Sequence, residues 1–259
     1  MGRRVERCTM SMTTSDLWVR RYHPRPDAPV RLVCFPHAGS SAPYYLPVSA
    51  NAGPGVDVLS VQYPGRQERR NEPLVDDLHE LAARCTDAVL PWLDRPFALF
   101  GHSMGATVAF EVARRLTAMS REPLHLFVSG RRAPSRLRDE DVHRRDDAGI
   151  VAEMQSLSGT DTRVFDDEDL LRSVLPVVRN DYKAAETYVY TEGEPLHCPV
   201  TVFTGHDDPK VSVEEADAWR GHTTGPAVLH VYDGGHFFLA RHQAAVLAVI
   251  TGSMTPAAV

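Results

Sequence analysis

The sequence predicts an α/β fold in which a mostly parallel central sheet is flanked by helices. Short apolar runs typical of buried strands alternate with helical segments up to about residue 130, and the alternation returns after about residue 190. A glycine-bounded turn joins one of these strands directly to a helix within residues 97–119. Alternating strands and helices are typical of a parallel sheet that is covered on both faces.

The individual elements follow from the spacing of the apolar residues. Strands are expected at residues 31–36, 57–63, 97–100, 124–130, 198–205 and 228–232. Helices are expected at residues 74–93, 106–119 and 213–221, and in the last segment after residue 236. A chain of 259 residues with 43% hydrophobic residues suits one domain with a sizeable core, which we place at residues 16–252. Residues 1–15 are expected to form a disordered N-terminal tail, and residues 253–259 a C-terminal tail.

The turn between the strand at 97–100 and its helix is Gly101-His102-Ser103-Met104-Gly105. A G-x-S-x-G sequence between a strand and a helix is the nucleophile elbow of the α/β-hydrolase fold. The turn is so tight that side chains two residues before and after the serine would collide, which explains both glycines. The sequence therefore predicts an α/β-hydrolase fold that presents the Ser103 hydroxyl as a nucleophile at the tip of the sheet.

A carboxylate and then a histidine follow Ser103, in the chain order that an elbow serine requires. His206-Asp207-Asp208-Pro209 comes after a strand that ends at Gly205, and His236 comes after the strand at 228–232. Open parallel sheets place their chemistry just past the carboxyl ends of the strands, where both groups are expected. With an ordinary pKa of ~6.5, His236 is suited to take and return the serine proton.

The carboxylate that orients His236 has three candidates. We expect Asp208, which stands three residues after the strand-ending Gly205. Asp207 is the close alternative, and Asp233 is the weaker one because it precedes the histidine loop. The simpler interpretation of Asp207 and Asp233 is that they are loop and turn carboxylates.

Two backbone amides are expected to stabilise an oxyanion. The Met104 amide lies at the N-terminus of the helix after Ser103. The second donor should come from the loop after an early strand, where Ala38 stands among small residues. His37 and His102 lie close by in the sequence, and we interpret them as supporting or structural histidines.

Five motifs in order resemble the signatures of type II thioesterases, the stand-alone α/β-hydrolases that accompany modular polyketide synthases and nonribosomal peptide synthetases. They are Phe35-Pro36-His37-Ala38-Gly39, Tyr63-Pro64-Gly65-Arg66, Gly101-His102-Ser103-Met104-Gly105, Gly205-His206-Asp207-Asp208-Pro209 and Gly234-Gly235-His236-Phe237. The resemblance runs from about residue 16 to about residue 252. One small departure from the family is Ser40, where a second glycine is common.

The resemblance implies hydrolysis of acyl groups from the phosphopantetheine thiol of an acyl carrier protein or peptidyl carrier domain, as editing of stalled or misprimed chains. It carries the catalytic triad onto Ser103, Asp208 and His236, and the oxyanion amides onto Met104 and Ala38. A triad alone does not distinguish a thioester from an oxygen ester. Two alternatives therefore remain, a product-releasing or small-ester hydrolase with the same triad, and an inactive hydrolase fold that serves as a binding module.

Residues from about 133 to 190 interrupt the alternation and are expected to form a helical insertion, which the resemblance implies is a lid. Helices are expected at residues 147–157 and 168–188, and Pro176 should kink or break the second. Met154, Leu157, Phe165 and Leu175 are candidates to line the acyl chamber, or else to pack the lid onto the body. Arg66 is a candidate either to contact the phosphopantetheine or to brace the lid.

Charge and composition limit the classes of partner and cofactor that we expect. The formal net charge of −6 argues against nucleic acid, and no apolar run approaches the ~20 residues of a membrane span. We expect no metal and no other cofactor, because the histidines and the four scattered cysteines lack ligand spacing. A cytoplasmic location and a monomer are expected. The basic residues within 131–145 are interpreted either as a docking surface for an acidic carrier domain or as a salt-bridged surface.

Overall fold

The computed structural model describes residues 17–157 and 163–254. The predicted tail at residues 1–15 lies outside these residues, as do residues 255–259 of the predicted C-terminal tail. Within the described residues, seven strands form one sheet in the order β1-β3-β2-β4-β5-β6-β7. The strands are β1 (Val19–Arg20), β2 (Val30–Phe35), β3 (Val56–Val61), β4 (Phe97–His102), β5 (His125–Ser129), β6 (Val200–Gly205) and β7 (Ala227–Tyr232). Only the two-residue β1 pairs antiparallel in this sheet, so the predicted α/β fold with a mostly parallel sheet is confirmed.

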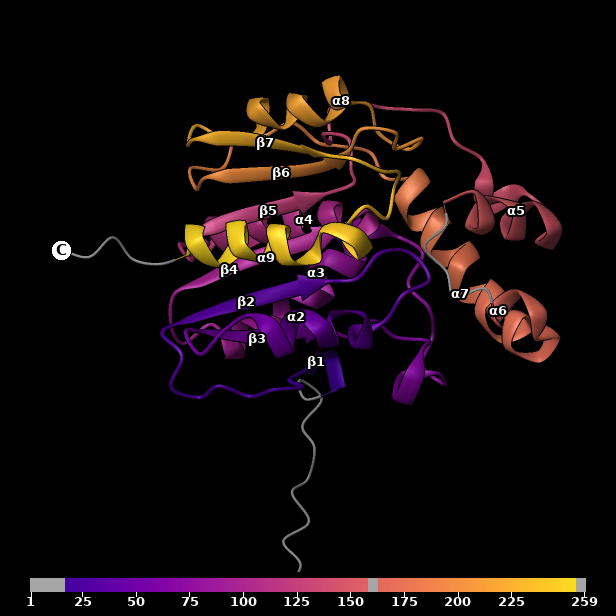
Figure 1. Cartoon of the computed structure of the whole chain (residues 1–259), viewed down its shortest axis with the longest axis horizontal. Coiled ribbons are helices and arrows are strands. Elements are labelled where there is room, and N and C mark those ends of the chain that lie inside the picture. Colours follow the sequence, from indigo (N-terminus) through magenta and orange to yellow (C-terminus); the bar gives the residue numbers. More distant parts are fainter. Residues whose placement is uncertain (1–16, 158–162, 255–259) are drawn as a thin grey trace, which may run out of the picture.

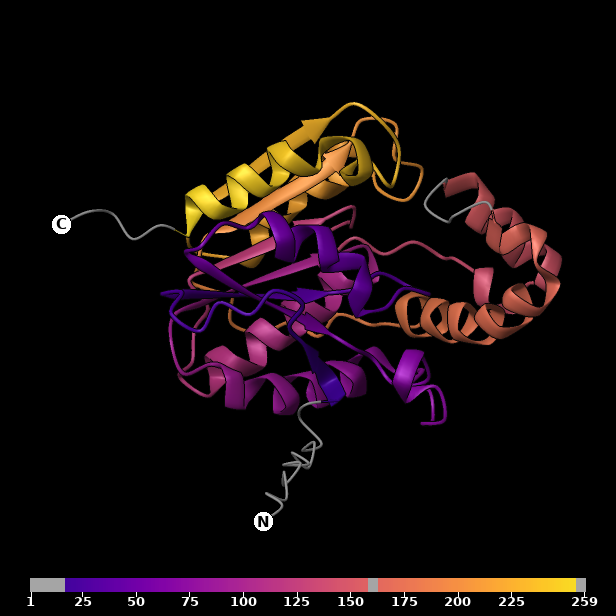
Figure 2. The ribbon, with the colours of Figure 1, turned by 60° about the horizontal axis from the view of Figure 1, so that its bottom comes forward.

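Helices cover both faces of the sheet. Helix α2 (Leu46–Asn51) and helix α9 (Leu239–Ser253) lie on one face, and α3 (Leu78–Val89) and α4 (Met104–Ala118) lie on the other (Figures 1 and 2). The strands β2 to β6 are buried along their whole length, and alternate residues enter one of two hydrophobic cores. Burial on both faces explains why these strands appear in the sequence as continuous apolar runs.

The helix expected over residues 74–93 is shorter than predicted. Helix α3 begins at Leu78 because the Asp77 side chain accepts a hydrogen bond from the Glu80 amide and caps the helix. Beyond Val89 the chain tightens into a 3-10 turn, η3 (Leu90–Trp92), which contains Pro91. The helix expected at 213–221 is likewise divided, into α8 (Val213–Asp217) and the 3-10 helix η5 (Ala218–His222).

Between β5 and β6 the chain leaves the sheet and forms a group of helices beside the carboxyl ends of the strands (Figures 1 and 2). They are η4 (Val142–Arg144), α5 (Asp147–Leu157), α6 (Arg163–Asp166) and α7 (Glu168–Glu186). A small core of their own joins them, formed by Val142, Ile150, Met154, Leu175 and Val178.

Of the two outcomes predicted at Pro176, a kink or a break, the break is wrong, because α7 is continuous from Glu168 to Glu186. Proline removes one backbone hydrogen bond, and Pro176 lies on the exposed side of α7, where water can satisfy the freed carbonyl. Leu175 and Val178, on either side of it, are buried in the small core and hold the helix in place. In the described parts of the chain, no helix combines the length and the apolar character that crossing a membrane requires.

Candidate active site

The turn after β4 has the geometry of a strained elbow. Ser103 has φ 54° and ψ −123°, a conformation that non-glycine residues rarely adopt. A Cβ on Gly101 would lie 2.0 Å from the Gly105 carbonyl oxygen, and a Cβ on Gly105 would lie 2.1 Å from the Phe35 carbonyl oxygen. Both glycines are therefore required by backbone contacts, one within the elbow and one between the elbow and the end of β2.

The structure brings Ser103, His236 and Asp208 into one hydrogen-bonded chain. The Oγ of Ser103 lies 2.9 Å from Nε2 of His236, and Nδ1 of His236 lies 2.9 Å from Oδ2 and 3.0 Å from Oδ1 of Asp208. Both His236 and Asp208 are buried, and the Lys210 amide donates a further hydrogen bond to Asp208 Oδ1. These partners favour the tautomer in which Nδ1–H donates to the carboxylate and Nε2 accepts from the serine.

The other two candidate carboxylates lie away from the imidazole. Asp207 and Asp233 are exposed. The Asp207 amide donates to the Gly234 carbonyl, and the Asp233 carbonyl accepts from Nε2 of His242. They therefore correspond to the loop carboxylates of the simpler interpretation.

The two predicted oxyanion donors face one cavity with Ser103. Met104 is the first residue of α4, and Ala38 lies in the loop after β2; both line the cavity that also contains Ser103 and His236. Two tyrosines hold the start of this loop, since Tyr45 donates to the Phe35 carbonyl at 2.7 Å and Tyr63 to the Pro36 carbonyl at 3.2 Å. The loop that carries Ala38 is thus anchored to the body of the protein by hydroxyl groups.

His37 and His102 surround the imidazole of His236 as neutral rings. Burial lowers the pKa of His37 to about 3, helped by the neighbouring His236 and Arg66, and burial lowers the pKa of His102 well below its usual value. The His102 ring lies 5.1 Å from the His236 ring, and its Nδ1 lies 3.0 Å from the Ser129 hydroxyl. Neutral rings at these distances shape the surroundings of His236 without adding charge.

The cavity above Ser103 is small, about 50 Å³, and helices of the insertion form its outer wall. Four charged or polar lining residues were not predicted, and they are Glu140, Tyr182, Glu186 and Lys210. Lys210 forms two ion pairs, in which its Nζ lies 3.0 Å from Oε1 of Glu140 and 2.5 Å from Oε1 of Glu153 on α5. Lys210 therefore joins the loop of Asp208 to the insertion. These are contacts between distant segments, and the local sequence gives no signal for them.

The four apolar candidates for the acyl chamber differ in position. Leu157 lines the cavity with Ser103. Met154 and Leu175 are buried in the small core of the insertion, and Phe165 packs against that core. These three contribute to the packing of the insertion, as the simpler interpretation has it.

Arg66 contacts the insertion. Its guanidinium forms two hydrogen bonds with the carboxylate of Asp181 on α7, at 2.7 Å and 2.9 Å, and a third with the Ser40 carbonyl at 2.9 Å. Of the two roles considered for Arg66, these contacts match the brace between the insertion and the body.

Three of the arginines within 131–145 are paired with acids. Arg132 pairs with Glu140, Arg138 with Glu215, and Arg145 with Asp141 and Glu153. These pairs agree with a salt-bridged surface, and a docking role for this region stays a prediction.

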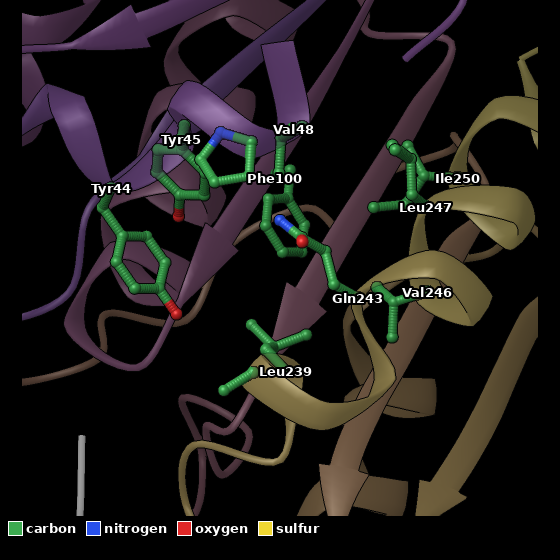
Figure 3. A pocket seen from close by; sticks show the side chains of 11 residues that line it. Tyr44, Tyr45, Val48, Phe100, Leu239, Gln243, Val246, Leu247 and Ile250 are labelled. Atoms are coloured by element: carbon green, nitrogen blue, oxygen red, sulfur yellow. The ribbon is translucent and has the colours of Figure 1, made fainter. Parts of the chain in front are cut away.

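A larger cavity of about 300 Å³ lies apart from Ser103, between α9 and the segment at residues 44–48 (Figure 3). Its walls are mostly apolar, with Phe100, Leu239 and Leu247 among them. His37 separates the two cavities, because it lines the first and its ring packs edge-on against Tyr44 of the second at 4.5 Å. Among the described residues, no group of three or more His, Cys, Asp or Glu side chains could hold a metal ion.

Residues 30–254 match the family described as Thioesterase domain. The chain belongs to this family. It is therefore a thioester hydrolase of the α/β-hydrolase fold.

Similar proteins agree with this membership. The chain is 53% identical over 254 residues to the "Probable cadicidin biosynthesis thioesterase" of Streptomyces griseus, covering 98% of this chain and 70% of the relative. It is 52% identical over 227 residues to "Thioesterase PikA5" of Streptomyces venezuelae, covering 87% of this chain and 81% of the relative. The solved structure of "the type II thioesterase BorB from the borrelidin biosynthetic cluster" superposes with a TM-score of 0.88 at 48% identity, covering 94% of this chain and all of that one.

Proposed function

We propose that this thioesterase acts as a type II enzyme of polyketide or nonribosomal peptide biosynthesis, and that Ser103, His236 and Asp208 are its catalytic triad. The observation that carries the proposal is the unbroken chain of hydrogen bonds from Ser103 Oγ through the His236 imidazole to the Asp208 carboxylate. A serine hydroxyl becomes a useful nucleophile only when a positioned base takes its proton. The names of the relatives support the pathway.

The proposed reaction proceeds in two halves. The Nε2 of His236 takes the proton of Ser103 as Oγ attacks the thioester carbonyl, and the amides of Met104 and Ala38 donate to the oxyanion. The tetrahedral intermediate collapses, the carbon–sulfur bond breaks, and His236 returns its proton to the leaving thiolate. A water molecule then attacks the acyl-serine with His236 as base, which releases the carboxylic acid and restores the serine. Asp208 holds Nδ1–H and stabilises the imidazolium in both halves.

The proposed substrate is a short acyl group on the phosphopantetheine of an acyl carrier protein or peptidyl carrier domain, removed as an editing reaction. The cavity of about 50 Å³ next to Ser103 supports a small acyl group over a complete product chain. We propose that residues from about 133 to 190 are a lid over this cavity, since Leu157 and Tyr182 of its helices line it.

The cytoplasm is the proposed place of action. Cys34, Cys85 and Cys198 are free thiols in the described part of the chain, and all three are buried. Unpaired cysteines are typical of a reducing compartment.

Thiol release from a panel of carrier-bound and pantetheine-bound acyl groups tests this proposal, with matched oxygen esters and the Ser103→Ala variant alongside. Turnover that depends on Ser103 and favours short acyl groups on carrier domains supports the editing thioesterase. Preference for full-length product thioesters would favour product release instead. Activity on oxygen esters alone, or thioester turnover that survives Ser103→Ala, would overturn the proposal.

A further inference from the structure

Helix α7 of the insertion rests directly on the loop that carries Ala38. A Cβ on Gly39 would lie only 2.7 Å from Cγ2 of Val178, so the loop backbone is packed against this helix. Asp181, one turn further along the same face of α7, accepts a hydrogen bond from the Gly39 amide at 2.8 Å. The helix therefore both packs against the loop and bonds its backbone.

The Asp181 carboxylate is one member of a closed ring of interactions. Its two oxygens accept from two nitrogens of Arg66, the geometry of a strong bidentate pair, and one of those nitrogens also donates to the Ser40 carbonyl. Asp181 is 1% exposed and Arg66 is 7% exposed, so water competes little for these bonds. The ring joins α7, the segment of Arg66 and two successive residues of the loop.

The ring fixes the backbone on the far side of Ala38. The Gly39 amide belongs to the peptide plane that follows Ala38, and the Pro36 carbonyl, held by Tyr63, lies on the near side. With both sides anchored, rotation about the backbone bonds of Ala38 is restricted, and its amide keeps one direction. An oxyanion donor is useful only when its direction is set before the charge develops.

We propose that Asp181 is a positioning residue that aligns the Ala38 amide for the oxyanion and makes this alignment depend on the seating of α7. The proposal rests on the proposed function, in which Ala38 is an oxyanion donor. If α7 lifts from the body, the Gly39 amide and Arg66 lose their shared partner and the loop is released. Hydrolysis is then confined to the state in which the insertion is seated.

The test compares Asp181→Asn with Lys183→Ala. Asparagine keeps the shape but replaces one acceptor oxygen with a donor that faces Arg66 or the Gly39 amide. Lys183 is the matched control, since it lies on the same helix and pairs with Asp76 in an exposed ion pair, which contributes little to holding α7 in place. The readouts are kcat and KM on the propionyl thioester of pantetheine, with the affinity for a trifluoromethyl ketone analogue, which forms a charged tetrahedral adduct, and for the matching methyl ketone.

Asp181→Asn is expected to lower kcat about ten- to a hundredfold with KM changed less than about threefold, because an ångström-scale shift of a donor costs about that much. Affinity for the trifluoromethyl ketone should fall by the same factor while affinity for the methyl ketone is kept, and Lys183→Ala should resemble the wild type. If Asp181 had a purely structural role, the substitution would lower the affinity for both ketones equally or would raise KM instead. Either result overturns the proposal. So does a kcat equal to that of Lys183→Ala.

Arg66→Lys provides a second route if Asp181→Asn does not fold. Lysine keeps the charge but loses the bidentate geometry and the bond to Ser40, so kcat should fall in the same direction. An unchanged kcat in Arg66→Lys would then overturn the proposal. Ser103→Ala is measured separately, because thioester turnover that survives it refutes the triad and not the role of Asp181.

Discussion

Replacing Gly105 by alanine should damage catalysis more than folding, and the structure gives the size of the disturbance. The new Cβ would lie 2.1 Å from the Phe35 carbonyl oxygen, and real Cβ contacts below 3.0 Å essentially do not occur. The backbone must therefore open by about 0.9 Å, either at the elbow that carries Ser103 or at the end of β2. Both are fixed backbone segments, and no flexible side chain can absorb the shift.

The displacement should affect the two measurements differently. Overpacking of a core contact costs about 1–3 kcal/mol of the free energy of unfolding. For a domain of this size that corresponds to a fall in Tm of roughly 2–12 °C. Because the shift separates Ser103 from the loop that carries Ala38, and a misplacement of about 1 Å costs about a hundredfold, we expect kcat to fall by about that factor.

The assay is steady-state hydrolysis of a pantetheine thioester together with thermal unfolding. Gly252→Ala is the matched control, because Gly252 lies in α9 with nothing within 4 Å of a new Cβ. Alanine there should leave kcat unchanged and keep or raise the stability by up to about 1 kcal/mol. If Gly105→Ala retained kcat within about threefold of the control, the argument from the backbone contact would be refuted.

Three further outcomes follow from the site and its surroundings. Asp208→Asn should lower kcat by about 10⁴, since the imidazole loses its orienting acceptor, while Asp207→Asn, at an exposed carboxylate, should stay near the wild type in the same thiol-release assay. Burial alone would raise the pKa of Glu140, but the charges of Arg132 and Lys210 outweigh it and lower that pKa from 4.5 to about 2. The stability that Glu140 contributes should therefore be present above about pH 4.5 and lost as the pH falls through about 2, so in urea unfolding the wild type should be more stable than Glu140→Gln at neutral pH and the two should converge in acid. Ala240→Phe, which fills the cavity of Figure 3, should leave turnover of short thioesters within about twofold, and a loss beyond tenfold would place the acyl chain in that cavity.

The elements that the sequence predicts well are those with a local signal. Each strand that is buried on both faces appears as a continuous apolar run, and the elbow glycines mark the turn at Ser103. The antiparallel β1 was not predicted, because two residues, Val19 and Arg20, carry no periodicity. The start of α3 was misplaced by four residues, because Leu74 continues the apolar spacing while the capping side chain of Asp77 sets the actual beginning.

The parts of the site that the sequence did not predict depend on long-range pairing. Asp181 lies 115 residues from Arg66 and 142 from Gly39, so no local pattern joins them. One signal was available in α7, where Asp181 occupies the same buried face as Leu175, Val178 and Ala185. A carboxylate in an otherwise apolar stripe requires a charged or hydrogen-bonding partner, and this alone predicts a buried contact for α7 without naming the partner.

The elbow that carries Ser103 and the loop that carries Ala38 are packed against each other. This contact explains how groups that are far apart in the sequence act on one substrate carbonyl. Gly105 of the elbow touches the Phe35 carbonyl at the start of the loop that carries Ala38, and the same carbonyl is held by Tyr45. On the other side of the loop, the Asp181 carboxylate accepts a hydrogen bond from the Gly39 amide. The strained backbone of Ser103 can persist because its surroundings over-determine it in this way. Since these contacts act through one short loop, their energetic effects are coupled. The losses of kcat caused by substitutions at Gly105 and Asp181 should therefore not add independently.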